Sequence, residues 1–242
     1  MWGRSMPSEP LVLLTRPEGE NSGLATRLAS AGIASREVPC IRIEPLADAA
    51  PLRDALLALT ADDLLVLTSP AGARAVAVAL GGRACAAPVG AVGPATAAVC
   101  GAAGLRVVFT PSVPSGAALA EQLPLPRGAV LLARSDRAAA EAAAILRGRG
   151  ALVGEVVAYR TVALPVDRVP AADAVVFASP SAVEGFAAAG TRPGVAIAIG
   201  PATADRVRAL LGTEPVVATP DDDGLARTIQ SALEGHRAAV GR

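Results

Sequence analysis

Hydroxyl residues stand directly before proline at repeated places along this 242-residue chain. Ser-Pro pairs occur at Ser69 and Ser179, and Thr-Pro pairs at Thr110 and Thr219. Each pair follows a short apolar run, and proline suits the first position of a helix, where its missing N–H costs nothing. The amides that follow such a proline are unpaired at the positive end of the helix. These turns predict helix starts that are either ordinary caps or sites for carboxylates and phosphates.

A second kind of turn is written twice, as "VGPATAA" from Val92 and "IGPATAD" from Ile199. In each copy an apolar run ends at glycine, proline follows, and Thr96 or Thr203 adds a hydroxyl close behind. Backbone amides at such a turn can bind an anion without a charged side chain. The same alternative, a cap without a ligand, stands for each of them.

The turns belong to a longer internal repeat. "VLLTR" from Val12 matches "VLLAR" from Val130, 118 residues later. The Ser-Pro pairs lie 110 residues apart, the Gly-Pro-Ala-Thr turns 107, and "VVFTP" and "VVATP" 109. Matches in the same order with a slowly drifting offset indicate a duplication with small loop changes.

The elements that must position these turns alternate along both halves. "LLVLTSPAGARAVAVALGG" is typical of a strand, a turn and a helix that stops at glycine. Strands that alternate with helices predict parallel sheets covered on both faces, so we expect two small doubly wound α/β domains. The turns then share the carboxyl edges of the sheets, and two domains facing each other would gather them around one polyanionic ligand. "REVPCIRIEPL" and "GEVVAYRTVAL" alternate like strands and are candidates for connecting segments.

Composition excludes several classes of protein. Net charge is zero and no basic stripe occurs, which disfavours nucleic acid or a membrane surface as partner. The chain has no lysine and a single histidine, His236, so Schiff-base chemistry, a Walker phosphate loop and a histidine triad are excluded. The uncharged stretch 84–105 is broken by Pro88 and Pro94 and reads as strand, turn and helix. Three unpaired cysteines and no apolar leader in the first residues predict a cytoplasmic protein.

The order of "LLTRPEG", "DLLVLTSPAGARAV", "VGAVGPATAA", "GEVVAYRTV", "VVFASPSAVEGF" and "IAIGPATADRVRALLG" resembles the uroporphyrinogen-III synthase family, from about Leu11 to about Leu233. The resemblance implies two flavodoxin-like doubly wound parallel-sheet domains joined by a two-stranded antiparallel linker. It implies a discontinuous first domain, residues 1–38 plus 166–242, and a second domain, residues 46–155. The connecting strands are then residues 39–45 and 156–165.

The resemblance also implies an activity: a cyclising hydro-lyase of tetrapyrrole (heme and cobalamin) biosynthesis. Such an enzyme closes hydroxymethylbilane, a linear tetrapyrrole with eight carboxylates, to uroporphyrinogen III with loss of water and inversion of ring D. It uses no metal or organic cofactor. We expect a monomer, and transient contact with the preceding pathway enzyme stays open.

Site residues follow from the same resemblance. Tyr159 is the candidate catalytic group, because a phenol can donate a proton to the departing hydroxyl. A packing role in its strand is the alternative. The family's substrate-binding loops correspond to Thr68, Ser69, Thr96, Ser179 and Thr203. Arg16, after the first strand, is a candidate partner for a substrate carboxylate or else a capping arginine.

Some positions depart from the family pattern. Ala71 and Gly72 stand where many members have asparagine or a basic residue, and Ser181 replaces a frequent asparagine. "DDDG", from Asp221, would repel a polyanion, so we expect it to begin the last helix, where acidic residues favour the dipole. The alternative function is a non-catalytic two-lobed binding or sensor protein for a polycarboxylate. A flavin protein is disfavoured, because the chain has one tryptophan and one tyrosine.

Overall fold

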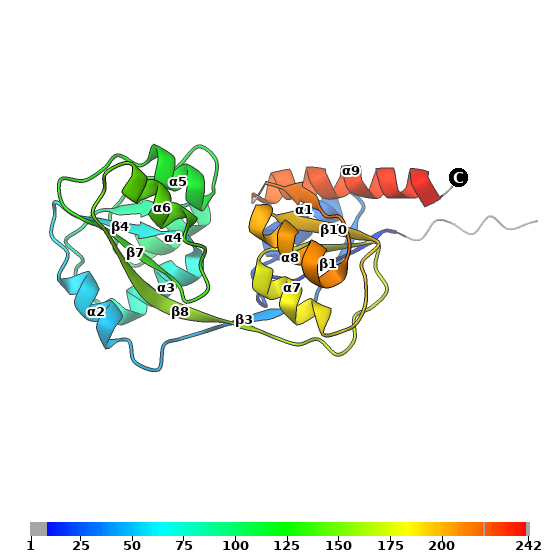
Figure 1. Cartoon of the computed structure of the whole chain (residues 1–242), viewed down its shortest axis with the longest axis horizontal. Coiled ribbons are helices and arrows are strands. Elements are labelled where there is room, and N and C mark those ends of the chain that lie inside the picture. The colour runs from blue at the N-terminus through cyan, green and yellow to red at the C-terminus, as the bar shows by residue number, and fades with distance from the viewer. Residues whose placement is uncertain (1–8, 220, 241–242) are drawn as a thin grey trace, which may run out of the picture. The chain divides into compact units, whose positions relative to one another are not determined.

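The computed structural model describes residues 9–219 and 221–240. The first residues, in which the sequence shows no apolar leader, therefore lie largely outside the described part of the chain. The chain forms two compact units (Figure 1). Unit 1 takes residues 1–42 and 162–242, and unit 2 takes residues 43–161. The chain passes from one unit to the other inside the segments 39–45 and 156–165 that the sequence marks as connections.

Unit 1 is a five-stranded sheet between two layers of helices. The strand order is β11 (Val216–Ala218), β10 (Val195–Ile199), β9 (Ala174–Phe177), β1 (Leu11–Leu14) and β2 (Ala34–Glu37), with every neighbouring pair parallel. The helices are α1 (Ser22–Ser30) and α9 (Asp222–Val240) on one face and α7 (Pro180–Ala187) and α8 (Pro201–Leu211) on the other (Figure 1). Both faces of the strands are apolar, as a doubly covered parallel sheet requires.

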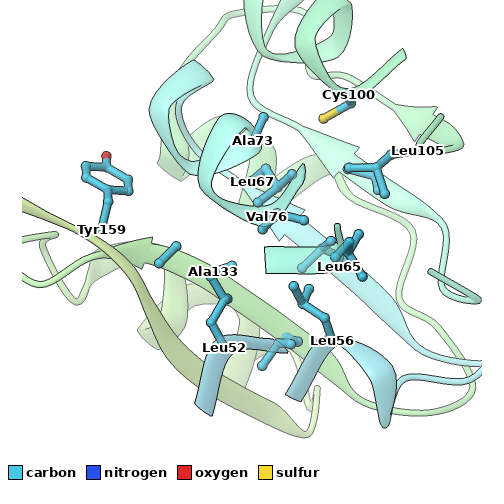
Figure 2. Packing of buried hydrophobic residues seen from close by; sticks show 14 of the residues in the cluster. Leu52, Leu56, Leu65, Leu67, Ala73, Val76, Cys100, Leu105, Ala133 and Tyr159 are labelled. Carbon is cyan, nitrogen blue, oxygen red and sulfur yellow. The ribbon is translucent and has the colours of Figure 1, made fainter. Parts of the chain in front are cut away.

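Unit 2 has the same layers around six strands. The order is β3 (Ile41–Glu44), β8 (Val153–Ala163), β7 (Val130–Ser135), β4 (Leu64–Leu67), β5 (Val89–Ala91) and β6 (Val107–Phe109). One face carries α2 (Ala50–Leu57), α3 (Pro70–Leu80) and α4 (Pro94–Ala102); the other carries α5 (Gly116–Gln122) and α6 (Glu141–Gly148). Leu52 and Leu56 of α2 and Val76 of α3 pack on Leu65 and Leu67 of β4 (Figure 2).

The duplication is visible in the topology. In unit 1 the order β2-β1-β9-β10-β11 is the flavodoxin order 2-1-3-4-5 when its strands are counted along the chain. In unit 2 the order β8-β7-β4-β5-β6 becomes 5-4-1-2-3 in the same count, with β3 added at the edge. The second unit is therefore the same sheet with its opening strand pair moved to the end of its sequence.

The Ser-Pro and Gly-Pro turns begin helices where the sequence predicts, but the two Thr-Pro pairs do not. Pro70, Pro94, Pro180 and Pro201 each stand at the start of a helix. The Thr-Pro prediction is wrong at Thr110, because α5 begins only after Ser115, whose hydroxyl accepts the Ala118 amide at 3.0 Å.

A helix starting at Pro111 would place Pro114 in its fourth position, where the missing N–H would break the first helical hydrogen bond. Thr219 likewise does not begin α9. Asp221 caps that helix by accepting the Gly224 amide at 2.6 Å. As expected, the acidic run stands at the first turn, with Asp222 and Asp223 inside it.

The uncharged segment 84–105 forms β5 and α4 with their flanking turns. Within the two described ranges, none of the helices combines the length and the apolar character needed to cross a membrane.

Candidate functional site

Polar residues lie at the carboxyl ends of the strands in each unit. In unit 2, Thr68 and Ser69 follow β4, Gly93 comes shortly after β5, and Arg134 lies near the end of β7. The strand order reverses between β4 and β7, and ligands of doubly wound sheets bind outside the carboxyl ends at such a reversal. The corresponding reversal in unit 1 lies between β1 and β9, which are followed by Thr15 and Ala178.

Tyr159 and Ser69 are brought together at this edge of unit 2. The two hydroxyl oxygens are 2.9 Å apart, although the residues are 90 positions apart in sequence. Ser69 also caps α3, since its Oγ accepts the Gly72 amide at 3.0 Å. The side chain of Tyr159 is 8% exposed, and Figure 2 shows it at the margin of the buried cluster, apart from the leucines. Ser69 therefore links the tyrosine hydroxyl to the first turn of α3, because its Oγ contacts both Tyr159 Oη and the Gly72 amide.

An irregularity in β8 turns Tyr159 toward α3. Arg134 pairs with Val157, but the next residue, Ser135, pairs with Tyr159, so Ala158 is extra in β8. Ala158 and Tyr159 are consecutive and both buried, which breaks the alternation of a regular strand. Without the extra residue, Tyr159 would project to the opposite face from Ala158. Such bulges re-aim side chains, often beside active sites.

Asp136 fixes the strand just beyond this irregularity. Its amide donates to the Tyr159 carbonyl at 3.1 Å, and its carboxylate accepts the Thr161 amide at 2.9 Å. Burial by itself raises the pKa of Asp136, but the Thr161 amide, the Ser135 hydroxyl and Arg160 outweigh it and the net shift is downward. The carboxylate thus stays charged, and Asp136 holds the backbone on either side of Arg160, through its amide at Tyr159 and through its carboxylate at Thr161.

Gly72 leaves room for this arrangement. A Cβ added there would lie 3.2 Å from Ser69 Oγ, 3.4 Å from the Ala133 carbonyl oxygen and 3.7 Å from Tyr159 Cε1. A larger side chain at this position would press on the serine hydroxyl. The departure from the family pattern noted in the sequence therefore has a local reason, which is close packing against the Ser69–Tyr159 pair.

The corresponding serine in unit 1, Ser179, has no tyrosine within its own unit, because the one tyrosine of the chain belongs to unit 2. Ser179 caps α7 by accepting the Ala182 amide at 3.2 Å, as Ser69 caps α3. The chain contains one tyrosine, so the hydroxyl pair is a feature of unit 2 alone. Both copies of the Ser-Pro turn therefore keep the serine cap, but only the copy in unit 2 has a tyrosine hydroxyl of its own unit beside the serine.

The two Gly-Pro-Ala-Thr turns differ from the serine turns because their side chains do not cap the helices. Neither Gly93 nor Gly200 supplies a side-chain cap, and the hydroxyl-bearing residues Thr96 and Thr203 are 1% and 3% exposed. Gly200 has φ 85°, a conformation that favours glycine. Hydrogen bonds within the described residues begin with the fourth residue after each glycine, leaving the amides before it for another acceptor.

An arginine lies near the carboxyl end of one central strand in each unit, and both arginines are paired. Arg16 Nη1 donates to Asp222 Oδ1 at 2.9 Å, with side-chain exposures of 17% and 28%. Arg134 pairs with Glu155 and donates to the Ala139 carbonyl at 2.7 Å. Arg134 is not among the residues predicted from the sequence, although it occupies the position of Arg16 in the repeat "VLLTR"/"VLLAR".

A small cavity lies at the strand reversal of unit 2. Its volume is about 160 Å³, and its lining includes Thr68, Leu132, Arg134, Ala138, Glu141 and Ala142. It has the size of a small substituent rather than of a whole large ligand. Of the residues expected to bind substrate, Thr68 is the one that lines it.

Two of the three cysteines are deeply buried thiols. Burial raises the pKa of the Cys40 thiol to about 12, and that of Cys100 to about 11, so both are protonated packing residues. Cys85 is also a free thiol. In the part of the chain that the structure describes, histidine, cysteine and carboxylate side chains do not gather in groups of three that could hold an ion.

The architecture and the site together define a class: a duplicated flavodoxin-like protein whose strand ends present amide turns and one tyrosine hydroxyl. The family model "Uroporphyrinogen-III synthase HemD" matches residues 22–227. The chain belongs to the uroporphyrinogen-III synthase family.

Individual relatives agree with this assignment. A uroporphyrinogen-III synthase from Synechococcus elongatus is 32% identical over 170 residues, which cover 64% of this chain and 64% of that protein. A solved uroporphyrinogen III synthase from Thermus thermophilus has 22% identity and a TM-score of 0.59 over 93% of this chain and 99% of that one. The synthase from Helicobacter pylori has 16% identity and a TM-score of 0.55 over 92% and 99%. At these identities the solved structures establish the fold.

Proposed function

We propose that this protein is a uroporphyrinogen-III synthase, which cyclises hydroxymethylbilane with inversion of ring D and loss of water. Membership of the family supports the reaction class. The observation that carries the proposal at the level of chemistry is the Tyr159 hydroxyl, held 2.9 Å from Ser69 Oγ at the carboxyl edge of unit 2. The proposed role of Tyr159 is to donate a proton to the departing hydroxyl.

The proposed chemistry balances without an added reagent. The C–O bond of the hydroxymethyl group breaks, and the phenolic proton leaves with the oxygen as water. The pyrrole that carried the group becomes an electrophilic azafulvene, and its N–H proton restores the phenol. Ring D then attacks the azafulvene through its substituted α-carbon and forms a spiro intermediate. The bond from that carbon to its old methylene bridge breaks, and the methylene rejoins ring D at its free α-carbon. The proton lost from the free α-carbon is balanced by the one taken up by the azafulvene nitrogen, so the macrocycle closes with ring D inverted. Correct orientation of the two ends can supply ~7–11 kcal/mol of such a barrier.

We propose that the substrate carboxylates are received by amide turns and hydroxyls. The assigned residues are Arg16, Thr68, Ser69, Thr96, Ser179 and Thr203. The unpaired amides after Gly93 and Gly200 support this assignment, because helix N-termini bind carboxylates. Since Thr96 and Thr203 are buried as whole residues, the proposed donors of these two turns are the backbone amides of Ala95 and Ala202, which belong to exposed residues. Arg16 would add a charge-assisted bond by sharing its guanidinium between Asp222 and a substrate carboxylate.

The proposed setting is the cytoplasm, with a monomer as the working form. Three free cysteines support a reducing compartment, where unpaired thiols persist. Size-exclusion chromatography with light scattering checks the monomer, and a dimer would contradict it.

Product isomer analysis tests the proposed function. Hydroxymethylbilane is generated in situ, the purified protein is added, and the oxidised porphyrins are separated into types I and III. The expected result is a shift from type I, the uncatalysed product, to type III. Tyr159→Phe should lower kcat by about 10²–10⁴-fold, the usual contribution of a positioned acid. Type I alone from folded protein would contradict the proposal and favour the second candidate, a polycarboxylate-binding or sensor protein without catalysis.

A further inference from the structure

We propose that Ser69 is a positioning residue for Tyr159. Its hydroxyl connects an amide at the positive N-terminus of α3 with the phenolic oxygen of Tyr159 through consecutive hydrogen bonds. This inference rests on the proposed function and deepens it, because it gives Ser69 a role in the reaction through the tyrosine. For the hydroxyl of Ser69, this role takes the place of the direct contact with a substrate carboxylate assigned above. The two roles predict different kinetics.

The hydrogen bonds around Ser69 give the direction of the relay. Ser69 Oγ accepts the Gly72 amide at 3.0 Å and lies 2.9 Å from Tyr159 Oη. A hydroxyl has one proton, and an oxygen that already accepts an amide is polarised to donate it. In the proposed arrangement Ser69 donates to Tyr159, so the phenolic proton is directed away from the serine. The hydrogen bonds then run from the Gly72 N–H to Ser69 Oγ and from the Ser69 O–H to Tyr159 Oη, the atom that loses a proton in the proposed reaction.

The consequence for the reaction is a stabilised phenolate. When the phenolic proton leaves with the substrate hydroxyl as water, the charge on Tyr159 Oη is met by the Ser69 O–H. That bond is in turn strengthened by an amide at the positive end of α3. When the pyrrole N–H proton returns to the phenolate, the original arrangement is restored.

Independent features of the fold serve the same contact. The extra residue Ala158 puts Tyr159 on the face of β8 that meets α3. Gly72 has no side chain, and a Cβ there would come within 3.2 Å of Ser69 Oγ. The repeat supplies an internal comparison, because Ser179 makes the same cap in unit 1, which contains no tyrosine. The serine cap therefore does not by itself require the hydroxyl pair.

A double-mutant cycle tests the relay in the full-length protein. We expect Ser69→Ala to lower kcat by about tenfold, as loss of one hydrogen bond in a transition state does, with a smaller change in KM. The variant Ser69→Ala/Tyr159→Phe should be no slower than Tyr159→Phe, because the serine has no further role once the hydroxyl is gone. Ser69→Thr, which keeps a hydroxyl and a cap, should retain most of kcat.

The matched control is Ser115→Ala. Ser115 caps α5 with the same serine-to-amide distance of 3.0 Å and lies outside the proposed machinery. Its loss should destabilise the fold much as Ser69→Ala does while leaving kcat unchanged. If Ser69→Ala does not fold, Ser69→Gly removes the hydroxyl at little cost to the cap and takes its place.

A spectroscopic measurement separates this proposal from the function itself. The Raman doublet of tyrosine reports whether the hydroxyl accepts or donates a hydrogen bond, and the chain has one tyrosine. We expect an accepting hydroxyl in the wild type, a changed doublet in Ser69→Ala and no change in Ser115→Ala. A hydroxyl that only donates, multiplicative losses in the double mutant, or a rise in KM with intact kcat would each overturn the relay. Type I product from the wild type would overturn the function, while the doublet would still decide the hydrogen bond.

Discussion

At the scale of single residues, the site uses side chains that are already engaged within the fold. Ser69 caps a helix and meets Tyr159, and Arg16 is paired with Asp222. Groups held in this way lose little conformational freedom when a ligand arrives. A polycarboxylate would therefore meet a surface whose donors are set in place before it binds.

Asp63, like the capping serine Ser69, has a counterpart at the corresponding position of the other unit. Its carboxylate accepts the Ala129 amide at 2.7 Å, which ties the entry of β4 to the entry of β7. Asp173 accepts the Leu11 amide at 2.8 Å and does the same for β9 and β1. The two aspartates stand 110 positions apart, the offset of the Ser-Pro pairs. The repeat thus preserves a clamp at the amino edge of each sheet, a feature that the sequence analysis did not find.

The pKa of Asp63 predicts a pH dependence. The Thr60 amide, the Thr60 hydroxyl and the Ala129 amide hold this pKa below its usual value. A depressed folded pKa means that the stabilisation is present above the unfolded pKa, about 3.9, and is lost as pH falls through the folded one. Asp63→Asn replaces one acceptor oxygen by an NH₂ group that cannot accept. We expect it to be less stable than wild type at pH 7 and to lose that difference below about pH 3.9.

Urea unfolding of both proteins at several pH values measures this. The neighbouring exposed residue gives the control Asp62→Asn, which should stay near wild type throughout. A constant difference between Asp63→Asn and wild type down to the lowest pH would contradict the assignment.

At the scale of elements, α7 is pressed against both chain segments that lead out of unit 1. A Cβ on Gly185 would lie 2.2 Å from the Cys40 carbonyl oxygen and 2.5 Å from that of Leu164. The Leu164 amide donates to the Cys40 carbonyl at 2.8 Å, and the Val166 amide to the Gly185 carbonyl at 3.1 Å. Backbone atoms surround the glycine, so they cannot move aside as a flexible side chain would.

Gly185→Ala should therefore destabilise the protein by about 3 kcal/mol, at the upper end of overpacking effects. Gly101→Ala is the matched control, because a Cβ on this glycine of α4 has no neighbour within 4 Å. There the helix should gain about 0.5–1 kcal/mol. Chemical denaturation measures both, and equal effects of the two substitutions would contradict the close approach.

The elements also show how far sequence reasoning reaches. Helices α3, α4, α7 and α8 begin at their prolines because local chemistry decides a helix start. The helix predicted at Thr110 failed because a second proline, Pro114, lies one turn on and Ser115 offers a better cap. The contact between Ser69 and Tyr159 could not be read from the sequence, because it depends on one extra residue in β8 and on pairing between distant strands.

At the scale of the whole molecule, unit 2 is built from one continuous segment of the chain, whereas unit 1 is built from two segments. Both buried clusters of unit 2 are made from residues inside 43–161. The clusters of unit 1 combine β1, α1 and Cys40 with elements beyond residue 162. A continuous fragment can therefore build one unit and not the other.

Expression of residues 39–163 should give a cooperatively folded domain, seen as dispersed amide resonances and a single unfolding transition. Residues 162–242 alone should not fold, because β9 would lack β1 as its neighbour. Adding a peptide of residues 9–42 should restore structure to that fragment. An unfolded 39–163 fragment, or a folded 162–242 fragment, would contradict this division.

The permuted order of strands sets a schedule for synthesis on the ribosome. The apolar strand β1 emerges early, but β9, which pairs with it, follows only after the 119 residues of unit 2. β9 begins about 160 positions after β1 ends, so at ~5–20 residues per second β1 waits roughly 8–32 s for that neighbour. During this interval unit 2 can fold completely while the beginning of the chain keeps its leucines exposed. The nascent protein is thus a nearly complete unit 2 preceded by an apolar strand that has β2 but still lacks β9, a natural client for chaperones that bind at the exit tunnel.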